Sequence, residues 1–323
     1  MKLLILRFSS IGDIVLTTPV IRSIKKAHPD WEIHYFTKPA FRQVLESNPY
    51  IDRLHLLEKD LGKQLQSLRK EGFTYIIDLH HNLRTLRIKR SLRLPSATFD
   101  KQNIAKFLLV RFKKTFRPIP HIVTRYTDTL RKLNIGSDGE GLDFFLPEGY
   151  EAKAKEILAN QSFNNPLAVV LGAQHRTKRW LPAHFITSLN QIGQPVVLIG
   201  GPDARNEADE IAAGLQVPCM DAVARYDLLT SAALMKQCRA VITHDTGFMH
   251  IAAAFHMKTY VLWGSTVPAL GMTPYQTEHY SLENQSLSCR PCSKLGHDAC
   301  PLGHFRCMTE LLPEQLTQAL TQP

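Results

Sequence analysis

The sequence contains no apolar stretch long enough to cross a membrane as a helix. The segment IAKFLLVRF (104–112) is too short and too charged for that role. The opening run MKLLILRFSSIGDIVL is interrupted by Arg7 and Asp13, and no small-residue cleavage site follows it, which argues against a secretory signal peptide. We therefore expect a cytosolic protein whose six cysteines are reduced.

Two common nucleotide-binding signatures are missing as well. The turn SSIGD (9–13), which follows the first predicted strand, lacks the third glycine of a G-x-G-x-x-G fingerprint, and no Walker A lysine occurs anywhere. A nicotinamide site at this turn and a P-loop are therefore not expected. Low-complexity tracts and internal repeats are also absent. With 323 residues and a hydrophobic fraction of 44%, the chain suits two folded domains better than one core.

Acidic residues are scarce in one part of the chain. From Arg84 to Arg117 there are eleven Lys and Arg residues and a single acid, Asp100, so this segment carries +10 (eleven minus one), which equals the formal net charge of the whole chain. Such a local excess favours an anionic partner (phosphorylated lipid, a membrane surface or nucleic acid) over a merely solvated helix face. Candidate contacts for that partner are Arg84, Lys101 and Arg111.

Apolar runs and helical periodicities alternate along the chain, which predicts parallel sheets with helices on both faces. In the first half we expect strands at 2–8, 32–37, 53–57 and 75–79, and helices at 14–28, 60–71, 82–93, 103–115 and 121–134. An acidic, Gly-rich stretch at 136–153 is the expected linker. In the second half we expect strands at 167–172, 195–201, 240–243 and 259–264, and helices at 182–192, 203–214, 227–238 and 247–256. We predict two Rossmann-like α/β domains, 1–150 and 151–323, with ligands beyond the carboxyl ends of the strands, at the cleft between the domains.

The SSIGD turn places a carboxylate near the start of the first helix. One interpretation is structural: Asp13 is an N-cap, worth about 1 kcal/mol. The other is functional: Asp13 is a general base that faces the cleft. The spacing favours neither, and Ser10 and Gly12 are candidate contacts for the molecule that such a base would deprotonate.

The loop GAQHRTKRWLP (172–182) follows the first strand of the second half. Lys178 could neutralise a phosphate as a point charge, whereas Trp180 is expected to pack in the core. Of three neighbouring residues, His175, Arg176 and Arg179, we expect at least two to lie on the solvated surface.

The motif GGPDARNE (200–207) also follows a strand. Its glycines, Gly201 among them, would let a ligand approach the backbone closely. Asp203 or Glu207 could bind ribose hydroxyls, although favourable placement in a first helical turn explains each acid slightly better.

The motif THDTGFMHIAAA (243–254) leads from a strand into a helix. The free amides at a helix start bind anions, and Thr246 and Gly247 offer such amides with little obstruction. An N-cap role for Asp245 is the structural alternative. A sugar diphosphate explains the combination better, because Asp245 would bind sugar hydroxyls while the amides bind phosphate, with His250 one turn further on. Taken alone, His250 is more typical of a structural histidine.

A cysteine group follows, with two histidines among its members. Only one C-x-x-C spacing occurs, so a structural zinc is less favoured than a reduced, buried cluster or an adventitious disulfide. The group consists of Cys289, Cys292, His297, Cys300, His304 and Cys307, whereas Cys219 and Cys238 are expected to be ordinary core residues.

Several of these motifs, in this order, together resemble glycosyltransferase family 9, the heptosyltransferases. They are LRFSSIGDIVLTTP, DLHHNLRT, KRWLP, THDTGFMHIAAA followed by VLWGST, and CRPCS with CPLGHFRCM. The resemblance implies a GT-B fold, with the acceptor on the first domain, the nucleotide-sugar on the second, and a last helix that can pack back on the first. It implies inverting, metal-independent transfer of heptose from ADP-heptose to the lipopolysaccharide inner core, without a cofactor. In this family pattern Asp13 corresponds to the base, Lys178 to the lysine at the donor phosphate, and Asp245 to the acid on the heptose hydroxyls, with Thr246 and Gly247 at the diphosphate.

The implied acceptor is an anionic, lipid-linked saccharide at the inner membrane face, which suits the basic segment and peripheral contact with that face. No nucleic acid is expected as a partner. The sequence departs from the family pattern at two places that bear on the choice of sugar. One is Gln174 and His175, where hydroxyl residues are common, and the other is the bulky pair Phe248 and Met249. Two rival functions remain: a nucleic-acid or anionic-lipid binding protein without catalysis, and a GT-B-like sugar-nucleotide epimerase.

Overall fold

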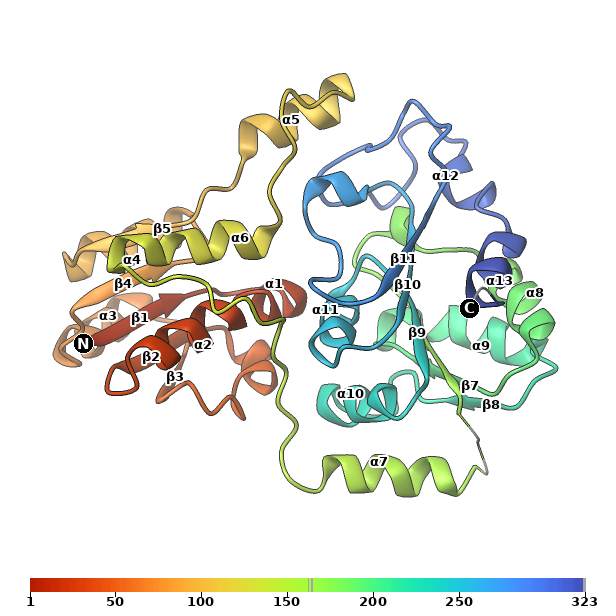
Figure 1. Ribbon diagram of the computed structural model, residues 1–323, viewed down its shortest axis with the longest axis horizontal. Coiled ribbons are helices and arrows are strands. Elements are labelled where there is room, and N and C mark those ends of the chain that lie inside the picture. Colours follow the sequence, from red (N-terminus) through yellow and green to blue (C-terminus); the bar gives the residue numbers. More distant parts are fainter. Residues whose placement is uncertain (162, 164, 322–323) are drawn as a thin grey trace. The chain divides into compact units, whose positions relative to one another are not determined.

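The computed structural model describes residues 1–161, 163 and 165–321. The chain forms two compact units, whose elements are labelled in Figure 1. Unit 1 comprises residues 1–101 and 120–145, and unit 2 comprises residues 102–119 and the chain from 146 onward. No helix among the described residues is long and apolar enough to cross a membrane.

Unit 1 contains a five-stranded sheet in the order β3-β2-β1-β4-β5, and all its strand pairs are parallel. Its strands are β1 (Lys2–Leu6), β2 (Glu32–Thr37), β3 (Arg53–Leu56), β4 (Tyr75–Asp78) and β5 (Ser96–Thr98). Its helices are α1 (Ile11–Val15), α2 (Thr18–Ala27), η1 (Pro39–Val44), α3 (Leu61–Lys70), α4 (Leu83–Leu92), α6 (Ile122–Thr127) and η2 (Asp128–Leu133). Residues 3–6 of β1 are fully buried, because helices cover both faces of a parallel sheet.

Unit 2 contains a six-stranded parallel sheet in the order β11-β10-β9-β6-β7-β8. Its strands are β6 (Leu167–Val170), β7 (Val196–Ile199), β8 (Cys219–Asp221), β9 (Ala240–His244), β10 (Thr259–Trp263) and β11 (His279–Glu283). Its helices are α5 (Asn103–Phe112), α7 (Tyr150–Ala159), η3 (Arg176–Lys178), α8 (Pro182–Ile192), η4 (Pro202–Ala204), α9 (Arg205–Gly214), α10 (Leu228–Lys236), α11 (Gly247–Ala254), η5 (Pro268–Leu270), α12 (Arg306–Thr309) and α13 (Pro313–Thr321).

Both sheets have the strand order of a Rossmann-like fold, which confirms the predicted class. Counted within each unit, the order is 3-2-1-4-5, and unit 2 adds a sixth strand. The order reverses between β1 and β4 in unit 1 and between β6 and β9 in unit 2. Ligands of open α/β sheets bind beyond the carboxyl ends of the strands at this switch point. Ligands are therefore expected at the loops after β1, β4, β6 and β9.

The sequence predicted the long elements well and the short ones poorly. All eight expected strands are present, but β5, β8 and β11 were not predicted. The expected helix at 14–28 is two helices, α1 and α2. The Thr17 hydroxyl donates to the carbonyl of Ile14, and Pro19, which has no N–H to donate, lies in the first turn of α2. The expected linker contains the start of α7.

Two segments distant in sequence both pack on unit 2. Residues 102–119 lie in unit 2, because Leu109 and Ile119 form a buried cluster with Leu270. The basic segment is therefore divided between the units, although it was expected to lie wholly in the first domain. The last helix packs on unit 2: α13 buries Leu316 and Leu320 in its core, and the Ser188 hydroxyl of α8 donates to the carbonyl of Pro313.

Candidate active site

Asp13 lies just beyond the carboxyl end of β1, as the third residue of α1. The N-cap is Ser10, so the N-cap interpretation of Asp13 is wrong. Asp13 instead completes a capping box, since its Oδ2 accepts hydrogen bonds from the Ser10 backbone N–H (3.3 Å) and the Ser10 hydroxyl (2.9 Å). The side chain is 25% exposed. It is held in place and remains within reach of a ligand.

Arg7 is the cation behind Asp13. Its Nη2 lies 2.8 Å from Asp13 Oδ2. The buried guanidinium also donates to the carbonyls of Ser9 (2.7 Å) and Leu79 (2.6 Å) and to the Tyr126 hydroxyl (2.9 Å). Burial disfavours its charge, but Tyr126 and Asp13 outweigh burial and raise the pKa of Arg7 above its ordinary value. A fixed positive charge therefore orients Asp13 and favours its ionised form, which a general base requires.

The loop after β4 contributes a histidine to the same end of the sheet. The buried Asp78 carboxylate accepts hydrogen bonds from the backbone N–H groups of His80 (3.1 Å) and His81 (2.7 Å), and Lys89 pairs with it at 2.9 Å. Burial, and then the charges of Arg7 and Lys101, lower the pKa of His80 to about 4. His80 is therefore neutral near pH 7 and adds no charge beside Asp13.

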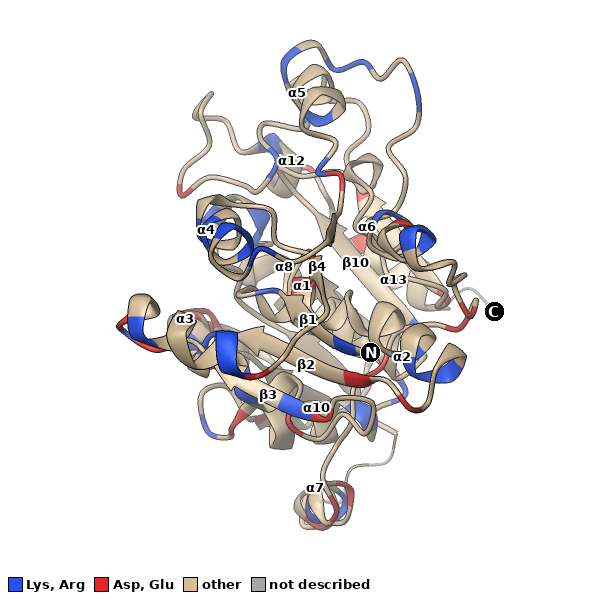
Figure 2. Ribbon diagram, turned by 90° about the vertical axis from the view of Figure 1, so that its left-hand side faces the viewer, with Lys and Arg blue, Asp and Glu red and all other residues tan. Residues whose placement is uncertain are grey.

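The candidate acceptor contacts divide between the units. Ser10, Gly12 and Lys101 belong to unit 1, together with Arg84, whose guanidinium lies over the Phe8 ring at 5.3 Å from its centre. Figure 2 shows Lys and Arg residues along α4. Arg111 lies instead on α5 of unit 2, where it is exposed.

In unit 2, the loops after β6 and β9 bring Lys178 and Asp245 together. The two side chains form an ion pair, with Lys178 Nζ 2.7 Å from Asp245 Oδ2. The Thr266 hydroxyl donates to the same oxygen at 2.9 Å. Each side chain of the pair is 14% exposed. The residues are 67 positions apart in sequence, and they meet because β6 and β9 are neighbours in the sheet.

A buried contact fixes the loop that carries Lys178. The Thr177 hydroxyl lies 2.8 Å from the Ser265 hydroxyl and accepts from the backbone N–H of His297 (2.8 Å). Gly264 permits this approach, since a Cβ at that position would lie 2.3 Å from the carbonyl oxygen of Thr177. The segment after β10 therefore positions η3, and through it Lys178.

The buried His244 links the same loop to β9. Its Nε2 accepts a hydrogen bond from the backbone N–H of Trp180 at 2.9 Å. Burial lowers the pKa of His244 to about 4, so the ring is neutral and can accept this bond. Trp180 is 2% exposed and packs in the core, as predicted.

Helix α11 begins beside Asp245. Its N-cap is Thr246 and its first residue is Gly247, so the alternative of an Asp245 N-cap is wrong. The bulky Met249 side chain is fully buried against Val261 and Trp263, so it does not add bulk at the mouth of α11. His250 is also buried, which favours a structural role for this histidine.

Arg179 holds both candidate ribose acids. Its guanidinium pairs with Asp203 Oδ2 (2.7 Å) and Glu207 Oε1 (3.0 Å) and donates twice to the carbonyl of Ala173. Both Arg179 and His175 are only partly exposed, so the expectation that at least two of the three neighbouring residues are solvated is wrong. The acids line a pocket of about 340 Å³ with Arg179.

Comparison with known proteins identifies the family. A family model described as glycosyltransferase family 9 (heptosyltransferase) matches residues 61–301, which is most of the chain. The chain belongs to glycosyltransferase family 9.

Relatives of this glycosyltransferase match over nearly its whole length. Lipopolysaccharide heptosyltransferase 1 of Pseudomonas aeruginosa is 26% identical, with 98% of this chain and 92% of that protein covered. Lipooligosaccharide heptosyltransferase 2 of Campylobacter jejuni is 24% identical, with 98% and 97% covered.

Solved structures show the same architecture. A family 9 glycosyltransferase of Veillonella parvula matches with a TM-score of 0.80 at 23% identity, with 98% of this chain and 95% of that chain covered. ADP-heptose lps heptosyltransferase II of E. coli matches with a TM-score of 0.76 at 19% identity, with 99% and 97% covered. The fold of this glycosyltransferase is therefore GT-B, as predicted.

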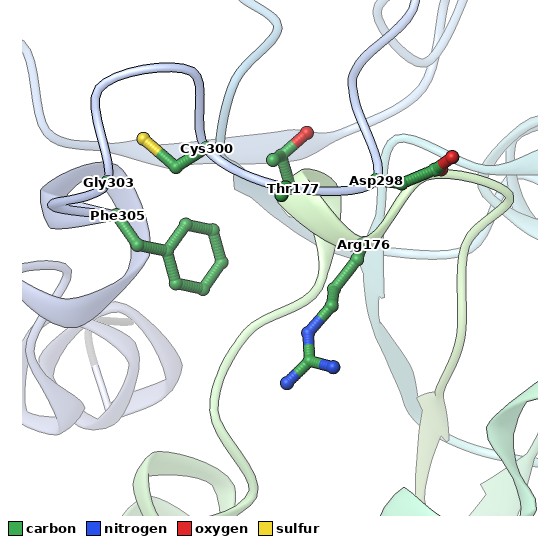
Figure 3. Close-up of a pocket in the computed structure, with 7 residues that line it drawn as sticks. Arg176, Thr177, Asp298, Cys300, Gly303 and Phe305 are labelled. Atoms are coloured by element: carbon green, nitrogen blue, oxygen red, sulfur yellow. The ribbon is translucent and has the colours of Figure 1, made fainter.

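The cysteine group of this glycosyltransferase lies in the irregular segment between β11 and α12, except for Cys307, which lies in α12. Cys289 Sγ lies 3.9 Å from His304 Nε2, and Cys307 is buried, which raises its pKa to about 11. All six cysteines of the chain are free thiols in this structure. Figure 3 shows Cys300 and Phe305 of this segment lining a pocket of about 330 Å³ together with Arg176 of η3.

Among the described residues, one group has the spacing for a metal ion, and it lies in unit 1. Its members are His34, His55 and Glu71. His34 Nδ1 already lies 2.8 Å from His55 Nε2, and Glu71 pairs with Lys2 (3.2 Å) and Arg53 (2.8 Å). These two cations satisfy the charge of Glu71, so hydrogen bonds and ion pairs explain the group without a metal ion.

Proposed function

We propose that this glycosyltransferase transfers a heptose, with inversion, from ADP-heptose to an anionic, lipid-linked core saccharide of lipopolysaccharide. The names of its relatives support the sugar and the pathway. The observation that carries the proposal is the Lys178–Asp245 pair at the switch point of unit 2. It combines one group suited to a phosphate with one suited to sugar hydroxyls.

The donor binds to the second domain, residues 151–323. Lys178 neutralises the diphosphate, and the amides of Thr246 and Gly247 at the start of α11 donate to it. Asp245 accepts hydrogen bonds from the heptose hydroxyls. When the donor binds, the diphosphate replaces Asp245 as the partner of Lys178. Hydrogen bonds from the sugar hydroxyls then replace the ion pair that Asp245 loses.

The nucleoside end of the donor lies over the loop that begins at Gly201. Here Asp203 and Glu207 bind the ribose while Arg179 keeps their carboxylates in position. His250 supports α11 from the buried side and does not contact the donor.

The acceptor binds to the first domain, residues 1–150. Ser10, Gly12, Arg84 and Lys101 contact it, and Arg111 adds a positive charge from the basic segment. Asp13 removes the proton from the acceptor hydroxyl. That oxygen attacks the anomeric carbon, the bond from carbon to the ADP oxygen breaks on the opposite face, and ADP leaves with the electron pair of that bond. Lys178 and the α11 amides stabilise the charge that grows on ADP, so no divalent ion is required.

The proposal is tested by a transfer assay with ADP-heptose and a lipopolysaccharide core acceptor, in the presence of EDTA. We expect ADP release that depends on the acceptor and a product of inverted configuration. A changed sugar nucleotide without acceptor would show an epimerase instead. Salt-dependent DNA binding without any binding of nucleotide-sugars would show the nucleic-acid rival.

A further inference from the structure

Helix α5 and the loop after it expose an unusual number of large apolar side chains. Ile104 is 78% exposed, Phe107 55%, Phe112 56% and Phe116 89%. The rings of Phe107 and Phe112 contact each other edge to face, with centres 6.4 Å apart. A group of large exposed apolar side chains like this one is typical of a site of interaction with a protein or a membrane.

The opposite side of α5 anchors the helix to unit 2. Ala105 and Leu109 pack with Ile119, Val267 and Leu270 in a small buried cluster. The Lys113 ammonium also donates to the carbonyl of Pro291 at 2.6 Å. The exposed side chains are therefore presented by a segment that is fixed at both ends, and they are not part of an unfolded loop.

Positive charge surrounds these apolar side chains. Residues 102–119 contain five basic residues and no acid, so the segment carries +5. Figure 2 shows Lys and Arg around α5 and in the loop that follows it. These basic residues are Lys106, Arg111, Lys113, Lys114 and Arg117. The guanidinium of Arg111 lies 5.6 Å from the centre of the Phe112 ring, so charge and apolar surface are in direct contact.

We propose that residues 102–118 form a membrane-docking element that inserts Ile104, Phe107, Phe112 and Phe116 into the headgroup region of an anionic bilayer. Helices that lie in this interface combine an apolar face of bulky side chains with Lys and Arg that bind anionic headgroups. Charge complementarity therefore selects an anionic lipid surface over a second copy of this chain, because two segments of +5 would repel each other. The use of this docking element rests on the proposed function, because docking would bring the enzyme to the membrane surface that holds its lipid-linked acceptor.

The test uses the full-length protein and co-sedimentation with vesicles. One set of vesicles contains phosphatidylglycerol and phosphatidylethanolamine, and the other contains phosphatidylcholine alone. The variant Phe112→Ser/Phe116→Ser removes two exposed rings that contribute nothing to the described cores, so folding is preserved. Leu312→Ser, which changes an exposed leucine before α13, is the matched control.

We expect the wild type and Leu312→Ser to bind anionic vesicles, and the double variant to bind them at least tenfold more weakly. Binding to phosphatidylcholine should be weak for all three, and added salt should weaken binding to the anionic vesicles. Wild-type-like binding by the double variant, or no vesicle binding by the wild type, would overturn the proposal. Two other results would also overturn it: a wild-type dimer that the double variant no longer forms, or binding to single-stranded oligonucleotides that the double variant loses, in either case with unchanged vesicle binding.

A second measurement separates this proposal from the proposed function. Transfer to a water-soluble core acceptor without acyl chains should be equal in the wild type and the double variant. A wild type that binds vesicles but transfers no sugar would contradict the proposed function and leave the docking element intact. A wild type that transfers sugar but does not bind vesicles would contradict the docking element and leave the proposed function intact.

Discussion

The ion pair between Lys178 and Asp245 has separable structural and catalytic roles, and a double-mutant cycle distinguishes them. The perturbations are Lys178→Met, Asp245→Asn and the double variant. At 2.7 Å and an effective dielectric constant of 20, the two charges attract by about 6 kcal/mol before the cost of desolvation is subtracted. Because that cost cancels much of the attraction, the net coupling should be about 1–3 kcal/mol.

Stability should therefore respond to the pair as a unit. Lys178→Met leaves a carboxylate that is 14% exposed with the Thr266 hydroxyl but without its cation, and we expect a loss of about 2 kcal/mol in the free energy of unfolding. The double variant removes both charges and should regain much of that loss. Urea unfolding of the four proteins measures the coupling.

Activity should not be regained. Lys178→Met removes a charge that stabilises the leaving group, which typically lowers kcat about 10²–10³-fold. Asp245→Asn cannot replace that charge, so the double variant should be at least as impaired. If Lys178→Met retained the wild-type kcat/KM, or if the double variant recovered both stability and turnover, the pair would be a structural feature only.

Three further predictions follow from single sites. Asp13→Asn should lower turnover roughly 10²–10⁴-fold and leave the calorimetric affinity for the donor unchanged; near-normal turnover would remove Asp13 as the base. Gly264→Ala places a Cβ 2.3 Å from the Thr177 carbonyl oxygen and should cost at least about 1–3 kcal/mol in urea unfolding, whereas the control Gly136→Ala, which has open space around it, should be nearly neutral. The pKa of His244 is about 4 in the folded chain and about 6.5 when unfolded, so only the unfolded state gains a proton between these values. Stability should therefore fall, by on the order of 3 kcal/mol from this site, as the pH is lowered from about 6.5 to about 4, and a free energy of unfolding that stays constant in this range would contradict the assigned burial.

The strands that build the site could be predicted because helices bury both of their faces. Such strands are continuous apolar runs, as in residues 3–6 of β1 and 196–199 of β7, and they are readily recognised in a sequence. Strands β5 and β8 have only three residues each and lack such runs. The edge strand β11 alternates polar and apolar side chains, with Tyr280 and Leu282 packed against the core of unit 2, so it has no continuous apolar run either.

The motifs placed Asp13, Lys178 and Asp245 at the ends of strands, and the topology confirms that placement. Their neighbours were harder to predict. Arg7 and His244 lie at the ends of apolar runs in the sequence, and their partners are distant in sequence, such as Tyr126 for Arg7 and Trp180 for His244. Only a charged or titratable residue inside or beside a predicted buried strand could have drawn attention to them.

Interpretation of surface charge failed where ion pairs form across loops. At least two of His175, Arg176 and Arg179 were expected to be solvated, but Arg179 binds Asp203 and Glu207, more than 20 residues away. The basic segment was treated as one surface, whereas packing of Leu109 on Leu270 assigns its second part to unit 2. Neither result follows from local sequence patterns.

The most direct measurement is calorimetric titration of ADP-heptose into the wild type and Lys178→Met, in EDTA, with UDP- and GDP-sugars as comparison ligands. The account predicts that the wild type binds ADP-heptose more tightly than the comparison ligands, and that Lys178→Met binds it at least tenfold more weakly. Equal affinity of both proteins for ADP-heptose, or no affinity of the wild type for any nucleotide-sugar, would contradict the central claim that unit 2 recognises its donor through Lys178 and Asp245.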